Sequence, residues 1–123
     1  MGFYNAEKYI QRSILSVMSQ NFKDYRCYIT SDNSTDNSVD LVNQIIKNDK
    51  RFKLVDDTDI KLYQTGNFDR NIRNNKEIDD NEVLVEVDGD DFLPDVNVLD
   101  RINNVYKDPN IWIANGSFQY ANS

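Results

Sequence analysis

Two acidic turns hold the side chains best suited to chemistry. Asp32 directly follows one predicted strand, and Asp88, Asp90 and Asp91 follow another. Two carboxylates separated by one residue in a tight turn can share a divalent cation, and Gly89 between them lets the backbone approach a ligand closely. Mg²⁺ is usually held by one or two carboxylates together with substrate phosphates. The spacing therefore suits a metal-bound diphosphate, and it equally suits an ordinary solvated turn, where Asp-Gly pairs are common.

The composition excludes several other kinds of site. The 123 residues include no His, which excludes His-based nucleophile systems and His-ligated metals. The single Cys27 excludes an internal disulfide and a Cys-based zinc site. With 14 Lys and Arg against 21 Asp and Glu, the net charge of −7 argues against nucleic acid or an anionic membrane as the main partner. Any bound metal should therefore be a hard ion with oxygen ligands.

Several familiar patterns are absent from the sequence. Neither common glycine-rich phosphate loop occurs, and the acidic turns lack the ladder of ligands that an EF-hand requires. No apolar run approaches the ~20 residues of a membrane span, and no signal-peptide pattern opens the chain. We therefore expect a soluble, cytoplasmic protein.

Hydrophobic periodicity alternates between helical and strand patterns. Apolar faces at helical spacing, or in one case a polar run, predict helices at 10–18, 39–46, 67–76 and 98–106. Short β-branched or aromatic segments predict strands at 25–31, 52–55, 83–87 and 111–114. Asn5 is the predicted cap of the first helix, Pro94 is placed near the first turn of the last helix, and 56–66 is a predicted loop.

Strands that alternate with amphipathic helices predict an α/β fold, with a mostly parallel sheet flanked by helices. No repeat, linker or low-complexity segment divides the chain, so residues 1–123 should form a single domain. In open sheets of this kind, ligands bind beyond the carboxyl ends of the strands. Parallel strands at 25–31 and 83–87 would therefore bring both acidic turns to one edge and into one site.

Four blocks of the chain resemble family 2 glycosyltransferases, in the order that the family has them. The first is Tyr-Asn-Ala-Glu-Lys-Tyr-Ile at 4–10 with Ser-Ile-Leu-Ser-Val-Met-Ser-Gln-Asn-Phe at 13–22. The second is the acidic turn Ser-Asp-Asn-Ser-Thr-Asp-Asn-Ser at 31–38, and the third is Arg-Phe-Lys-Leu at 51–54. The fourth, Val-Asp-Gly-Asp-Asp-Phe-Leu-Pro-Asp at 87–95, is similar to the family's metal-binding Asp-x-Asp motif.

The resemblance implies a Rossmann-like GT-A fold and a nucleotide-diphosphate-sugar donor. By position, Tyr4 would stack on or flank the base, and Asp32 would accept a hydrogen bond from it, typically from the imide N–H of uracil. Asp88 would lie near the ribose and the water shell of the metal. Asp90 would be the main direct ligand of Mn²⁺ or Mg²⁺, with Asp91 in support.

The resemblance places three further residues less directly. Gly89 lies within the nucleotide-sugar site between the two carboxylates. Lys61 is a candidate to reach the diphosphate, and Arg70 is a rival for that role. Both cations are also ordinary surface residues in any acidic protein.

The chain departs from the family at both ends. Only residues 1–3 precede Tyr4, where the family has a hydrophobic central strand, and the chain stops after 116–120, about where the acceptor-binding half begins. A smaller departure is Ser31, where the family often has a second Asp. The chain therefore resembles an incomplete, donor-binding half, and the usual carboxylate base is not assigned to any of its residues. Without a full central strand, neighbouring backbone groups would be unpaired, which predicts self-association through a sheet edge.

Three functions are consistent with the sequence. The first is an enzyme, a metal-assisted, inverting glycosyltransferase that moves a sugar from a nucleotide-diphosphate donor, with a UDP-sugar favoured, to an acceptor hydroxyl on a glycan, lipid or protein. The second is a non-catalytic remnant that binds nucleotide or metal and transfers nothing. The third is an acidic domain that acts only in protein association.

Overall fold

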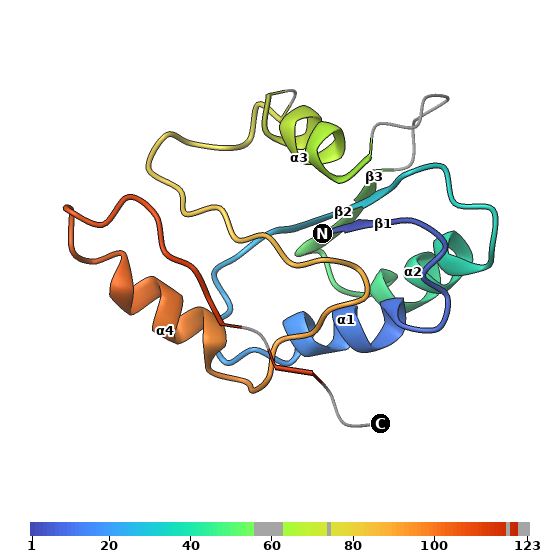
Figure 1. Ribbon diagram of the computed structural model, residues 1–123, viewed down its shortest axis with the longest axis horizontal. Helices are drawn as coiled ribbons and strands as arrows, with labels where there is room; N and C mark the ends of the chain where they lie inside the picture. The colour runs from blue at the N-terminus through green and yellow to red at the C-terminus, as the bar shows by residue number, and fades with distance from the viewer. Residues whose placement is uncertain (56–62, 74, 118, 121–123) are drawn as a thin grey trace.

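The computed structural model describes residues 1–55, 63–73, 75–117 and 119–120, and the side chains at 64, 67, 70 and 71 fall outside that description. A small central sheet is flanked by helices (Figure 1). In chain order the elements are β1 (Gly2–Phe3), α1 (Ile10–Met18), β2 (Cys27–Ser31), α2 (Ser38–Ile46), β3 (Phe52–Val55), α3 (Tyr63–Arg73) and α4 (Val98–Val105).

The sheet has three parallel strands in the order β1-β2-β3. Strand β2 pairs with β3 from Cys27 opposite Phe52 to Thr30 opposite Val55. Strand β1 pairs with β2 at only two positions, Gly2 opposite Thr30 and Phe3 opposite Ser31. The α/β class and the parallel arrangement predicted from the sequence are therefore confirmed.

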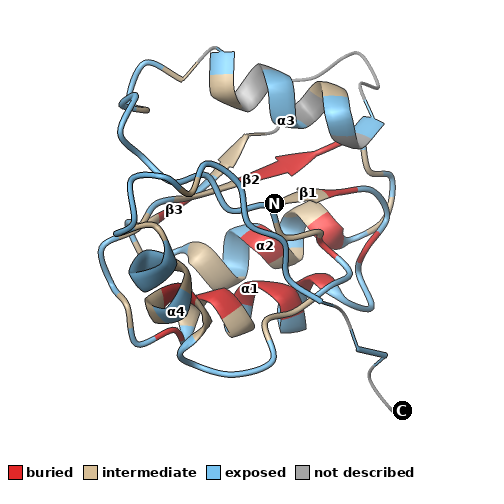
Figure 2. Cartoon of the chain, turned by 60° about the vertical axis from the view of Figure 1, so that its left-hand side comes forward, coloured by how far each residue is buried: buried red, intermediate tan, exposed pale blue. Residues whose placement is uncertain are grey.

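Helices α1 and α2 cover one face of the sheet, and α3 lies over the other (Figure 1). Red, buried positions gather where α1 and α2 meet the sheet, whereas α3 and α4 are mostly exposed or half-buried (Figure 2). The buried apolar cluster consists of Phe3, Ala6, Ile10, Ile14, Val17, Ile29, Val42 and Phe52. Burying a large aliphatic side chain contributes about 1.5–3 kcal/mol, so this cluster is the main source of stability.

The strand predicted at 83–87 is wrong for this structure. Residues 82–88 are not in any strand, and Val83, Leu84 and Val85 are 42%, 47% and 39% exposed. A strand exists only where a neighbour supplies hydrogen-bond partners. The neighbour on this side is β1, which is two residues long. Its Gly2 carbonyl accepts the N–H of Gly89, which lies beyond the predicted strand.

The strand predicted at 111–114 is also wrong. These residues are in no strand, and Trp112 and Ile113 are 90% and 80% exposed. Among the described residues no strand runs beside them, so their high β-propensity is not realised.

Three local predictions also need correction. Helix α1 begins at Ile10 with Tyr9 at the N-cap position, so Asn5 does not cap it. Helix α3 begins at Tyr63, inside the segment predicted as loop, and ends at Arg73. Pro94 lies before α4, which begins only at Val98.

None of the helices in the described part of the chain has the length and apolar character needed to cross a membrane.

Candidate functional site

Strand β1 lies between the two acidic turns and holds one on each side. The Asp32 N–H donates to the Phe3 carbonyl at 2.8 Å, and the Gly89 N–H donates to the Gly2 carbonyl at 2.8 Å. Successive carbonyls of a strand point to opposite sides. Two consecutive residues are therefore enough to fix both turns at one edge of the sheet.

The two turns border one pocket of about 410 Å³. Five of the residues predicted for nucleotide-sugar or metal binding line it: Tyr4, Asp32, Asp88, Gly89 and Asp90. Asp91 is exposed and is not part of the lining. Lys61 lies outside the described residues, and so does the side chain of Arg70, which belongs to α3.

Asp32 is held in place by the start of α3. Its side chain is buried, with 5% exposure, and its two carboxylate oxygens each accept from the Tyr63 N–H at 3.2 Å. The amino end of a helix carries partial positive charge, which favours a carboxylate at this position. Tyr63 has φ 57°, in the left-handed region that bulky residues rarely adopt. This contact links α3 to the pocket.

Gly89 is required by the close approach of the second acidic turn to β1. A Cβ built on Gly89 would lie 2.5 Å from the Cβ of Phe3 and 2.9 Å from the Gly2 carbonyl oxygen. Both distances are far inside van der Waals contact. The glycine therefore sets how near Asp88 and Asp90 come to the sheet, as well as allowing the turn.

Two serines of α1 and a glutamine just beyond its end fix the second acidic turn and the segment that follows it. Ser13 Oγ donates to the Gly89 carbonyl at 2.8 Å, and Ser16 Oγ accepts from the Leu93 N–H at 3.0 Å. Gln20 Nε2 donates to the Asp95 carbonyl at 2.6 Å. Buried polar groups of this kind are stabilising only when they are paired.

Gln20 also takes the place of a helix cap. Its Oε1 accepts from the Leu99 N–H at 3.0 Å, whereas Asn97, the N-cap residue of α4, makes no side-chain cap bond. No role for Ser13, Ser16 and Gln20 was predicted from the sequence. The available signal was limited to Ser13 and Ser16, which are three residues apart on α1, because Gln20 lies beyond the end of that helix.

A second network joins the loop after β1 to the loop after β2. Asn5, in the left-handed region with φ 46°, accepts from the Thr35 N–H at 2.8 Å, and the Ala6 N–H donates to Ser38 Oγ at 2.8 Å. Asp36 accepts from the Glu7 N–H at 3.1 Å. Burial raises the pKa of Asp36, but bonds from Ser38 and Glu7 outweigh it and hold the pKa below its ordinary value. The network fixes Tyr4 relative to Asp32.

Three tyrosines supply exposed aromatic surface to the pocket. Tyr4, Tyr9 and Tyr63 all line it, with exposures of 49%, 55% and 69%. Exposed rings at a pocket offer flat apolar faces for a planar ligand. Of the three, Tyr4 alone was predicted from the sequence.

The carboxylates at the pocket fit a hard divalent cation that takes further ligands from a substrate. Asp88 is half-buried and Asp90 exposed, and both border the cavity. Across the described residues, no group of three His, Cys, Asp or Glu side chains gathers as a complete metal site. Two carboxylates are sufficient for Mg²⁺ when phosphates and water complete the shell. The metal prediction for Asp88, Asp90 and Asp91 stays a prediction.

The sequence matches a known protein family over most of its length. A family described as glycosyl transferase family 2 matches residues 1–115. The chain belongs to this family. Two uncharacterized glycosyltransferases of Haemophilus influenzae are 43% identical over 54 residues and 38% identical over 52 residues. These matches cover 44% and 42% of this chain, but only 22% and 16% of the two relatives.

Solved structures of a glycosyltransferase fold share the architecture. S. aureus TarS 1–349 in complex with UDP-GlcNAc superimposes with a TM-score of 0.68 at 25% identity, over 86% of this chain and 29% of TarS. The structure of TarS 1–349 in complex with UDP superimposes with a TM-score of 0.66 at the same sequence identity, over 86% of this chain and 30% of TarS. These matches confirm the predicted GT-A fold. The metal, the acceptor and self-association remain predictions from the sequence.

Proposed function

We propose that this family 2 glycosyltransferase chain binds a nucleotide-diphosphate sugar, with a UDP-sugar favoured, and serves its transfer to an acceptor hydroxyl. The observation that carries the proposal is that Asp32, Asp88 and Asp90 border one pocket, although they follow different parts of the chain. The TarS structures that share the fold contain UDP-GlcNAc or UDP, which supports a uridine nucleotide here.

The base would lie at the Tyr4 and Asp32 end of the pocket. Asp32 has two carboxylate oxygens near the cavity and is held by Tyr63 and by the backbone of Phe3. A carboxylate is a pure acceptor when ionised, so it selects a base with a facing N–H donor such as the imide of uracil. The exposed ring of Tyr4 would flank the base.

The diphosphate would lie at the end formed by the second acidic turn. Asp88 and Asp90 would hold Mn²⁺ or Mg²⁺, with Asp91 nearby in sequence. When bound, that ion supplies positive charge that offsets the negative charge developing on the departing diphosphate. Ser13 would position the two carboxylates through its bond to the Gly89 carbonyl, and Gly89, which lines the pocket, would let the turn approach the ligand closely.

The proposed reaction inverts the anomeric carbon in a single displacement. The acceptor oxygen forms a bond to that carbon as the bond to the diphosphate oxygen breaks, and the hydroxyl proton passes to a general base. We assign that base to no residue of this chain. The chain spans less than a third of the relatives and structures compared above, so the acceptor and the base belong to the proposal for the whole protein.

The second candidate is binding without transfer. It is favoured by one observation, that every predicted residue placed in the pocket belongs to the donor side of the reaction. A third, association with other proteins alone, would leave the pocket without a nucleotide. A cytoplasmic location likewise remains a proposal.

Calorimetric titration with UDP, with and without Mn²⁺, separates these candidates. The proposal predicts binding that Mn²⁺ strengthens, and an assay of sugar transfer from the UDP-sugar then separates an enzyme from a binding module. At a ligand concentration a hundred times its Kd, the free energy of unfolding should rise by about 2.7 kcal/mol. Absence of any UDP binding would contradict both nucleotide-based candidates and favour the third.

A further inference from the structure

The proposed base-binding end of the pocket has a second aromatic side chain, to which the proposed function gives no role. Tyr63, the first residue of α3, lines the pocket together with Tyr4 and Asp32. Tyr4 directly follows β1, whereas α3 lies over the face of the sheet opposite α1 and α2 (Figure 1). Two tyrosines therefore reach this end of the pocket from different elements.

Both tyrosines are tied to Asp32 by backbone hydrogen bonds. The Asp32 N–H donates at 2.8 Å to the carbonyl of Phe3, the residue before Tyr4. The two carboxylate oxygens of Asp32 each accept from the Tyr63 N–H at 3.2 Å. An ionised carboxylate offers about four acceptor positions, so the Tyr63 N–H leaves others for a ligand. A planar base that donates to Asp32 would therefore lie beside both tyrosines.

The backbone of Tyr63 is held in an unfavourable conformation at the pocket. Its φ of 57° is in the left-handed region, where bulky side chains are rarely found. Such conformations persist where surrounding contacts fix them, and they are concentrated at ligand-binding and active sites. Here one contact that fixes the backbone is the bond to the buried Asp32. The carboxylate that would bind the base therefore also sets where Tyr63 lies.

Tyr9, the third tyrosine of the pocket, belongs to the opposite end. Ser13 Oγ lies 3.3 Å from the Tyr9 carbonyl oxygen and donates to the Gly89 carbonyl at 2.8 Å. Tyr9 is thus joined to the second acidic turn, where the diphosphate would lie. Tyr63 is the tyrosine placed to share the base with Tyr4.

We propose that Tyr63 is a second base-binding residue, whose ring stacks on the planar base that Asp32 and Tyr4 contact. This inference rests on the proposed function, in which the pocket takes a nucleotide. An aromatic ring stacked on a base strengthens binding by about 5- to 150-fold and tolerates any base, because every base has a flat π-face. Tyr63 therefore adds affinity for the nucleotide, while Asp32 selects the base.

Tyr63→Asn removes the ring with little change to the backbone. Asn retains the N–H that bonds to Asp32, and it adopts positive φ more readily than Tyr does. Calorimetry should show that the Kd for UDP rises about 5- to 150-fold, with the gain in affinity from Mn²⁺ unchanged, because the ring acts on the base and not on the diphosphate. The urea midpoint should not fall. Tyr63→Phe retains the ring and should bind UDP with most of the wild-type affinity.

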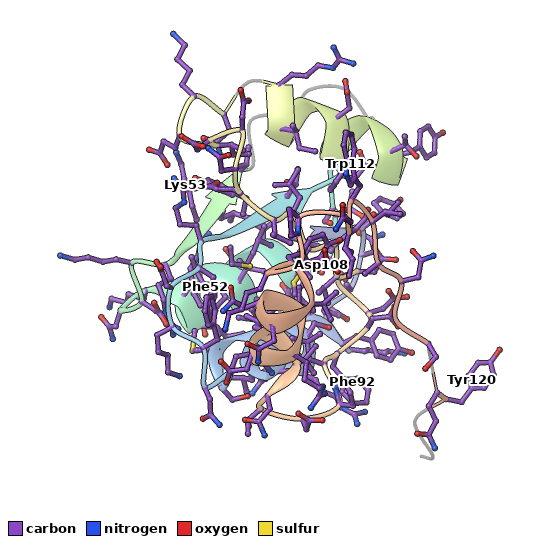
Figure 3. All side chains as sticks on the ribbon, turned by 90° about the vertical axis from the view of Figure 1, so that its left-hand side faces the viewer. Phe52, Lys53, Phe92, Asp108, Trp112 and Tyr120 are labelled. Carbon is purple, nitrogen blue, oxygen red and sulfur yellow. The ribbon has the colours of Figure 1, made fainter. Side chains whose placement is uncertain are left out.

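Tyr120→Asn is the matched control. Tyr120 is 84% exposed and does not line the pocket. It projects from the body of the protein on the side away from α3 (Figure 3). The same exchange of Tyr for Asn at this position should leave the UDP affinity and the urea midpoint at their wild-type values.

Three results overturn the inference while UDP binding by the wild-type protein upholds the proposed function. The first is an unchanged UDP affinity in Tyr63→Asn. The second is an equal loss in Tyr63→Phe, which would assign the effect to the hydroxyl. The third is a loss of affinity together with a lower urea midpoint, which would mean that the ring only holds α3 in place. Absence of UDP binding by the wild-type protein contradicts the proposed function itself, and this inference with it.

Discussion

Residues 27–31 and residues 83–87 were both predicted to lie in strands, but they have different structures. Cys27–Ser31 forms a strand whose Ile29 is fully buried, whereas Val83–Val87 is the more hydrophobic stretch and forms no strand. The difference lies in their neighbours. Strand β2 has β3 along one edge and β1 at the end of the other. Among the described residues, 83–87 pair with no strand, and the bond to β1 comes from Gly89, beyond their end. A segment with high strand propensity therefore forms a strand only where a neighbouring strand can hydrogen-bond to it.

Paired truncations should show the largest effect. Ile29→Ala removes a fully buried side chain from β2 and should lower the free energy of unfolding by about 2–5 kcal/mol. Val85→Ala, at a 39% exposed position, should change it by less than about 0.5 kcal/mol. Urea unfolding measures both. Equal losses would mean that 83–87 is packed as firmly as the sheet.

Gly89→Ala should have the next largest effect, because it acts where the two segments meet. The added methyl would collide with Phe3 and with the Gly2 carbonyl. Overpacking of this kind costs about 1–3 kcal/mol. The same change should weaken UDP binding, since Asp88 and Asp90 would move away from β1. Gly116→Ala is a suitable control because nothing lies within 4 Å of its added Cβ. Unchanged stability and binding in Gly89→Ala would refute the close approach.

Gln20→Ala should act on the segment after the turn and on the start of α4. It leaves the Leu99 N–H and the Asp95 carbonyl without their partner, at a cost of about 1–3 kcal/mol for a buried unpaired group. Hydrogen exchange at Leu93 and Leu99 should become faster while exchange in β2 stays slow. Ser19→Ala, at an exposed position of the same helical region, is the matched control. Uniformly faster exchange would instead indicate loss of the whole fold.

The smallest effect should come from acid titration of Asp36. Its pKa is lowered in the folded protein, so its contribution is present above the ordinary carboxyl pKa of about 4 and is lost as the pH falls below it. Asp36→Asn should therefore reduce the difference in urea midpoint between pH 7 and pH 3, compared with the wild-type protein. An identical pH dependence in the two proteins would show that the bonds to Glu7 and Ser38 do not stabilise the ionised form.

The sequence predicted correctly the helices and strands whose local residue pattern agrees with the contacts that they make in the fold. Helices α1 and α2 and strand β3 follow from their apolar spacing. Asp32, Asp88 and Asp90 border one pocket as expected, but β1 brings the two turns together and the predicted strand at 83–87 does not form. All four blocks that resemble the family lie within the residues that its model matches.

The wrong predictions share a physical cause. The residue types of a segment indicate its strand or helix-cap propensity, but they do not show which other segment supplies its hydrogen-bond partners. The segments 83–87 and 111–114 carry strand-like residues without a neighbouring strand. Asn5 has the residue type of a helix cap but bonds to Thr35 across two loops. Ser13 and Gln20 are polar residues that are buried because backbone groups of a distant segment meet them, which no local pattern specifies.

The central claim is that the carboxylates of the two turns act on one ligand, and metal-dependent UDP binding to carboxylate variants tests it most directly. Calorimetry should show that Asp90→Asn removes the gain in UDP affinity produced by Mn²⁺, while Asp32→Asn weakens UDP binding with or without the ion. Asp80→Asn, at an exposed position away from the pocket, should bind as the wild-type protein does. Unchanged UDP affinity in both Asp90→Asn and Asp32→Asn, with Mn²⁺ present, would contradict the account.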